Sequence, residues 1–246
     1  MTQETVAAAP SFTLRANLKL VAYWLTIGAA AGGLGGALVG GIGGRLAMFV
    51  LRLTSDDSVR GIDSDDGFII GRFDLSSTME LMLITTILGV TVGLVVAFGR
   101  PFFPWRGMPF AWGLAGALIG GSIIVRKDGV DFNVLEPALL AIIMFIAIPA
   151  LGAALIAWLV ELYPRFWVRR RWLTGLAAIA GLPVIVGFPI AIAAGVVGGI
   201  WSAAMLSPEI RTLPNRKPVR IAARVAFVLI VTPGFIGLVN DVRAIL

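Results

Sequence analysis

Two glutamates, Glu80 and Glu136, have the surroundings in this sequence that best suit acid–base chemistry. Each follows a hydrogen-bonding residue by three positions, in Ser77-x-x-Glu80 and Asn133-x-x-Glu136, and each precedes a long apolar segment. A carboxylate within or at the edge of a membrane can bind a proton or a cation. The same spacing is typical of a capping box, in which the glutamate accepts a backbone hydrogen bond and complements the helix dipole. We favour capping, so the spacing predicts two helix N-termini.

Further charged residues fall on the same side of the predicted membrane as these glutamates and could form a polar site with them. The candidate site residues are Arg45, Asp65, Asp66, Glu80, Asp128 and Glu136. Carboxylates that converge with a cation would suit an enzyme acting on lipid or cell-envelope substrates, and the arginine could clamp an anionic ligand. The plainer alternative is that Arg45 and Arg52 pair with the acidic loop that follows them or reach lipid headgroups.

This acidic loop, from Thr54 to Ser77, contains six aspartates and two arginines. Counted from Asp63 as a calcium loop, it places Phe68 where an EF-hand needs glycine and Gly67 where it needs an oxygen ligand. We therefore expect a solvated loop or a surface for a partner, and no metal. The chain contains no Cys and no His, which excludes iron–sulfur clusters, thiolate or imidazole metal sites and Ser-His triads, and we expect no cofactor.

The composition places these residues in a membrane protein. Of the 246 residues, 58% are hydrophobic, and the mean hydropathy is +0.94. A water-soluble domain must cover its surface with polar groups and does not need so much apolar material. The 17 Arg against 3 Lys, with many Ala and Gly, are typical of a GC-rich bacterial genome. We predict one integral membrane domain over residues 1–246 in a bacterial inner membrane, surrounded by lipid and without a nucleic-acid partner.

Several stretches without a charged residue are long enough, or nearly so, to cross a bilayer. They run from Leu20 to Gly44, Leu81 to Gly99, Gly107 to Val125, Pro137 to Val160, Trp172 to Pro208 and Val225 to Asn240. The stretch 172–208 is nearly twice as long as one helix needs, and Gly-x-Pro sequences ending at Pro183 and Pro189 break its middle. Either two full spans or a re-entrant hairpin fits this segment. Two spans give an all-α transmembrane bundle of about seven spans.

The distribution of basic residues orients the bundle, because cytoplasmic loops hold the excess of Lys and Arg. Seven spans with a cytoplasmic N-terminus place 13 basic residues inside and 7 outside, whereas six spans place 9 inside and 11 outside. We therefore expect seven spans and a cytoplasmic N-terminus. The acidic loop and the candidate site then lie on the outer face.

A stripe of glycines follows one face of the first apolar segment at every fourth residue, which lets another helix approach closely. It consists of Gly28, Gly32, Gly36, Gly40 and Gly44. We expect this face to pack inside the bundle, or against a second copy of the chain or another membrane protein. The alternative is a glycine-lined permeation path.

The sequence around this stripe recurs later in the chain. Gly36-Ala-Leu-Val-Gly-Gly41 resembles Gly116-Ala-Leu-Ile-Gly-Gly121, and an arginine, Arg45 or Arg126, follows each within five residues. An Asp-Gly pair, a Phe and the motif ending in Glu80 or Glu136 then follow in the same order. The likeness predicts a parallel repeat of helical hairpins, formed by spans 1–2 and 3–4.

No charged residue lies near the middle of any predicted span, although pumps and ion-coupled carriers usually place ionisable groups there. The sequence names no substrate and no reaction. It favours a non-enzymatic membrane protein, either a passive or weakly coupled permease or a subunit packed in a membrane complex through its glycine faces. The alternatives are an enzyme acting on lipid or envelope substrates at the outer face, and an envelope sensor whose acidic loop receives a ligand.

Overall fold

The computed structural model describes residues 14–64, 69–70, 74–103, 107–167 and 212–246. These residues are helical and contain no strand beyond an isolated antiparallel bridge between Asp63 and Ile69. The predicted all-α fold class is therefore confirmed for the described part of the chain. The segment 172–208, where the sequence predicts two spans or a re-entrant hairpin, lies outside the described residues.

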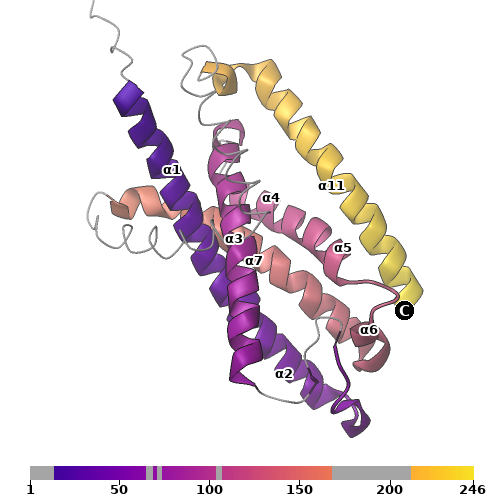
Figure 1. Cartoon of the computed structure of the whole chain (residues 1–246). Coiled ribbons are helices and arrows are strands. Elements are labelled where there is room, and N and C mark those ends of the chain that lie inside the picture. Colours follow the sequence, from indigo (N-terminus) through magenta and orange to yellow (C-terminus); the bar gives the residue numbers. More distant parts are fainter. Residues whose placement is uncertain (1–13, 65–68, 71–73, 104–106, 168–211) are drawn as a thin grey trace, which may run out of the picture.

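The first hairpin begins with one long continuous limb (Figure 1). It consists of α1 (Leu14–Gly35), a π-helical segment (Gly36–Gly43) and α2 (Gly44–Thr54). A loop with a short 3₁₀ turn (Asp57–Val59) leads to α3 (Leu75–Gly99), which returns along this limb.

The second hairpin repeats the order of these elements. Its first limb consists of α4 (Met108–Ala115), a π-helical segment (Gly116–Gly120) and α5 (Gly121–Ile124), and its second limb is α7 (Ala138–Trp167). The short helix α6 (Val130–Val134) joins the limbs, and 3₁₀ turns at Arg100–Phe102 and Leu213–Asn215 precede α4 and α11. The helix α11 (Lys217–Ile245) packs along the π-helical segment Gly116–Gly120 and α5 (Figure 1).

Four described helices are long and apolar enough to cross a membrane, namely Ala22–Thr54, Leu75–Phe102, Ala138–Arg165 and Lys217–Ile245. Met108–Ile124 forms a shorter apolar helix, and large apolar side chains are exposed along the bundle, as lipid contact requires. The charge-free stretches underestimate the helices, because the first helix continues through Arg45 and Arg52 to Thr54. Long basic side chains near a span end can reach polar surroundings, so a charge does not end the helix there.

The glycine stripe lies against α3. A Cβ atom built on Gly28 would lie 2.9 Å from the carbonyl oxygen of Gly93, and one on Gly32 would collide with the carbonyl of Gly89. Further along, Gly36 and Gly40 meet the backbone and side chain of one α3 residue, Thr85. At Gly44 a Cβ would make only ordinary contact, 3.6 Å from Leu81. Glycine is therefore required where the two backbones touch.

The second hairpin packs through glycines in the same register. In each hairpin, the first glycine of the π segment meets a backbone carbonyl of the returning helix. The fifth residue, also a glycine, meets the side chain of that same residue, and the next glycine along the chain meets a side chain three residues earlier. The pairs are Gly36, Gly40 and Gly41 with Thr85, Thr85 and Met82, and Gly116, Gly120 and Gly121 with Pro149, Pro149 and Ile146. The two hairpins thus share a packing geometry as well as a sequence pattern.

Two apolar clusters mark the ends of the bundle. One contains Trp112 and Val160, and the other contains Phe145 and Leu135; we refer to them as the Trp112 end and the Phe145 end. Early in α11, Phe227 stacks edge-on against Trp112 with ring centroids 5.2 Å apart, whereas Leu238 packs in the Phe145 cluster. Hence α7 ends, and α11 begins, at the Trp112 end.

The glycine contact can be tested with two substitutions in the same π segment. Gly36→Ala adds a methyl group against the α3 backbone, whereas a Cβ at Gly43 would meet nothing closer than 3.7 Å. We expect Gly36→Ala to destabilise the protein by roughly 1–3 kcal/mol or more, since a well-packed contact is overfilled. Gly43→Ala should be neutral or slightly stabilising. Thermal unfolding in detergent measures the difference, and equal midpoints would show that the stripe does not hold the hairpin together.

Candidate functional site

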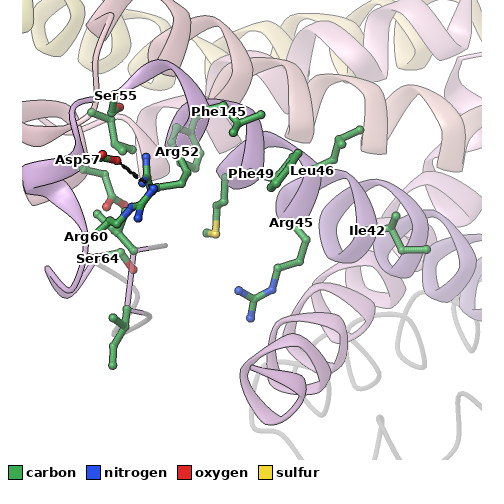
Figure 2. Close-up of a pocket in the computed structure, with 16 residues that line it drawn as sticks. Ile42, Arg45, Leu46, Phe49, Arg52, Ser55, Asp57, Arg60, Ser64 and Phe145 are labelled. Atoms are coloured by element: carbon green, nitrogen blue, oxygen red, sulfur yellow. Dashed lines mark hydrogen bonds and ion pairs between the residues drawn. The ribbon is translucent and has the colours of Figure 1, made fainter. Parts of the chain in front are cut away.

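A cavity of about 900 Å³ opens at the Phe145 end, between α2, the loop that follows it, α6 and α7 (Figure 2). Its polar lining consists of Arg45, Arg52, Ser55, Asp57, Arg60, Ser64 and Asp131. The remaining lining is apolar and comes mainly from one side of α2 and from the Phe145 cluster. The cavity therefore combines charged groups with an apolar wall.

The helix α2 positions the two arginines that the sequence singles out. Arg45 and Arg52 are seven residues apart, which places them two turns apart on one face of the helix. Both line the cavity, and both are partly buried (Figure 2). Figure 2 shows the Arg52 side chain directed toward Asp57, whereas the guanidinium of Arg45 lies apart from this ion pair.

Asp57 accepts from two arginines. Arg52 Nη2 donates to Asp57 Oδ1 at 2.8 Å, and Arg60 Nη2 approaches the same oxygen at 3.0 Å. The predicted pairing of Arg52 with the acidic loop is thus confirmed. Asp57 is 80% exposed, so water screens this pair and its contribution to stability is small. Its effect is to hold the two guanidinium groups together at the cavity wall.

The loop is also fixed locally by its own backbone. Asp56 precedes the 3₁₀ turn, and its Oδ1 accepts from the Ser58 N–H at 2.8 Å. This hydrogen bond to the charged form lowers the pKa of the Asp56 carboxyl. The carboxylate therefore stays ionised while it caps the turn.

Ser55 ties the end of α2 to the far wall of the cavity. Its buried Oγ accepts from the Glu136 N–H at 2.9 Å and donates to the Leu51 carbonyl at 2.8 Å. Glu136 lies between α6 and α7, so this one hydroxyl fixes two cavity walls relative to each other. The sequence gives no local sign of this role, because the two residues are 81 positions apart.

The structure brings only part of the predicted polar site together. Arg45 lines the cavity, whereas Glu80, Asp128 and Glu136 are exposed and do not contribute to its lining. Asp65 and Asp66 lie outside the described residues. Within the described part of the chain, no group of three acidic residues is close enough to hold a metal ion.

Sequence reasoning missed Asp131. This carboxylate is only 6% exposed, sits in α6 and lines the cavity with Arg45. A single aspartate beside a short helix carries no recognisable motif, so only the folded chain places it in the site.

The two predicted capping boxes are wrong in their helix boundaries. α3 begins at Leu75 after Asp74, whose Oδ2 accepts from Ser76 Oγ at 2.6 Å and Ser77 Oγ at 3.1 Å. An aspartate is a strong N-cap residue, so the helix begins before Ser77 rather than after it. α7 begins at Ala138, after Pro137, while Asn133 belongs to α6 and donates to the Gly129 carbonyl at 2.7 Å.

The physical reason at α7 is the proline. The residue before a proline is disfavoured in the helical region, so Glu136 cannot continue a helix from Asn133. Proline itself suits the start of a helix, which is where Pro137 stands. This difference also means that Glu136 does not occupy the position in the second hairpin that Glu80 occupies in the first.

Comparison with known protein families, with curated proteins and with solved structures finds no match to this chain. The site is therefore interpreted from its own geometry.

The start of α3 gives a pH-dependent prediction. Hydrogen bonds from Ser76 and Ser77 lower the pKa of the Asp74 carboxyl from 3.8 to about 2. A depressed folded-state pKa stabilises the protein above the unfolded-state pKa, and this contribution is lost as the pH falls from about 4 to about 2. Asp74→Ala should therefore lower the unfolding midpoint at pH 7, and the difference from the unmodified protein should shrink across this window.

Glu80→Ala is the control, because Glu80 is exposed on the same helix and does not cap it. Its unfolding midpoint should stay close to that of the unmodified protein at pH 7. A larger loss for Glu80→Ala than for Asp74→Ala would restore the glutamate as the capping residue.

Proposed function

We propose that this chain is a non-enzymatic, permease-like membrane protein that binds its ligand in the cavity at the Phe145 end. The observation that carries the proposal is the cavity itself, about 900 Å³ in volume with a few polar groups on an otherwise apolar wall. This combination is typical of sites for small or medium-sized ligands. Glu80 and Glu136, two of the carboxylates that the outer-face enzyme hypothesis uses, lie outside its lining, as does Asp128.

A subunit that packs on a partner through its glycine stripe is less well supported. Gly32 and Gly36 already lie against the backbone of α3 within the same chain. A second helix could not occupy that face without displacing α3. Association through another surface, including a homo-oligomer, remains compatible with the proposed function.

An enzyme is the second candidate, and one observation favours it. Asp57 and Asp131 line the same cavity as Arg45, and hydrolytic sites often combine two acidic groups with a cation. Asp57 Oδ1, however, is already engaged in ion pairs with Arg52 and Arg60, which favours a structural role for this carboxylate. The two candidates differ in whether a bound ligand is released unchanged.

We further propose seven spans in the inner membrane, with a cytoplasmic N-terminus and the Phe145 end outside. The positive-inside count supports this topology. The position of α11 also supports this topology, because α11 begins at the end of the bundle where α7 stops. A chain that crosses the membrane an even number of times between these two helices returns to the same side of the membrane. The matched glycine contacts of the two hairpins support the proposal that they form a parallel repeat.

The topology can be tested by cysteine labelling, since the chain contains no Cys. Ser58 is exposed at the Phe145 end and Asn215 is exposed at the Trp112 end. A membrane-impermeant thiol reagent applied to intact cells should label Ser58→Cys and should label Asn215→Cys only after the membrane is opened. Labelling of both variants in intact cells would contradict an even number of crossings between α7 and α11.

The ligand site can be tested by native mass spectrometry of the protein purified in mild detergent. We expect a small molecule to copurify with the unmodified protein at one copy per chain and to be lost from Arg45→Gln, because that guanidinium lines the cavity. Arg126→Gln is the matched control, since Arg126 is exposed at the same end outside the lining. A stoichiometric second protein with no small ligand would instead indicate a complex subunit. Chemical conversion of the released molecule would indicate an enzyme.

A further inference from the structure

We infer that the ligand of this cavity is a phospholipid with a net negative headgroup, taken from the leaflet at the Phe145 end. This inference rests on the proposed function and specifies its substrate class. It combines three features of the described residues: the charge of the lining, the exposed apolar wall of α2, and the order in which these follow one another along the helix.

The formal charge of the described lining is positive and suits an anionic ligand. Three guanidinium groups, of Arg45, Arg52 and Arg60, face two carboxylates, of Asp57 and Asp131. The described lining therefore has a formal net charge of +1, which a headgroup with one net negative charge would neutralise and a zwitterionic headgroup would not. Each guanidinium has five N–H donors, so an arginine already bound to a carboxylate can still donate to a phosphate.

The apolar wall fits acyl chains. Four residues of the π segment and α2 that line the cavity are also open to the surroundings of the bundle, namely Ile42, Leu46, Phe49 and Leu53, which are 55%, 60%, 60% and 67% exposed. Leu38 and Leu34 continue the exposed apolar surface along the same limb. A water-soluble anion would gain nothing from this wall, whereas acyl chains can lie along it from the cavity into the bilayer.

The order of the groups along the helix matches the order of groups in a phospholipid. Arg52 lies near the end of α2, and Arg45 lies about 10 Å deeper along the same helix, given a rise of 1.5 Å per residue. Leu38 lies further still toward the middle of the limb. A headgroup beside Arg52 and Arg60, a phosphate within reach of Arg45 and chains beyond Ile42 would follow this sequence.

The inference is tested with the full chain, stripped of lipid by detergent exchange and titrated in native mass spectrometry. The probes are phosphatidylglycerol and phosphatidylcholine with identical chains, the corresponding diacylglycerol, and glycerol 3-phosphate. We expect one phosphatidylglycerol to bind per chain, about tenfold more tightly than phosphatidylcholine, a difference of about 1.4 kcal/mol. Diacylglycerol lacks the phosphate and glycerol 3-phosphate lacks the chains, so both should bind weakly.

Matched variants separate the headgroup from the chains. Arg45→Gln should remove the preference for phosphatidylglycerol, and Phe49→Asn should weaken both phospholipids. Arg126→Gln and Leu83→Asn should change neither, since Arg126 is exposed outside the cavity and Leu83 is 53% exposed on α3. Thermal unfolding of each variant checks that it is folded.

Three results would overturn the inference: equal affinity for the two phospholipids, binding of glycerol 3-phosphate as tight as that of phosphatidylglycerol, or equal effects of the variants and their controls. In those cases a different copurifying molecule that is lost from Arg45→Gln would leave the proposed function standing. If no ligand depends on Arg45 for binding, both this inference and the proposed function are wrong.

Discussion

The structure depends on the contact between two helix backbones in an environment where the hydrophobic effect cannot hold helices together. Lipid chains are as apolar as leucine, so association must come from close packing and polar contacts. Gly32 on the first limb and Gly89 on α3 each lie so near the other helix that neither could carry a side chain. Larger residues at these two positions would separate the hairpin and remove the dispersion contacts of the whole interface.

This contact also explains why the cavity lies where it does. The glycine face of the first limb is buried against α3, so the residues around the rest of the helix must face other elements or lipid. Beyond the π segment, the last glycine of the stripe, Gly44, is only in ordinary contact with Leu81, and α2 diverges into a region with fewer packed neighbours. There Arg45 and Arg52 face the cavity while Leu46 and Phe49 stay exposed. Packing at one end of the limb thus leaves a cavity at the other.

The regular features of the fold could be predicted from the sequence, whereas the contacts between residues far apart in the chain could not. The four-residue period of the glycines and the likeness of the segments starting at Gly36 and Gly116 could be read directly, because a helix converts period into a face. Helix ends were less predictable, since Asp74 competes with Ser77 for the start of α3. The bond between Ser55 and Glu136 joins residues far apart in the chain, and no local pattern records such a contact. The same holds for Asp131, which lines the cavity together with α2 residues that lie far from it in the sequence.

The cavity arises from a difference between two otherwise similar hairpins. Both first limbs pass from an α-helix through a π segment at corresponding glycines, but α2 then continues for 11 residues, whereas α5 stops after four. In the first hairpin, this extension of about 16 Å carries Arg45 and Arg52 beyond the shared packing core. In the second, the chain turns early into α6 and brings Asp131 and Leu135 against the extension. A repeat with equal limbs would bury these ends on each other. The inequality leaves the space between them.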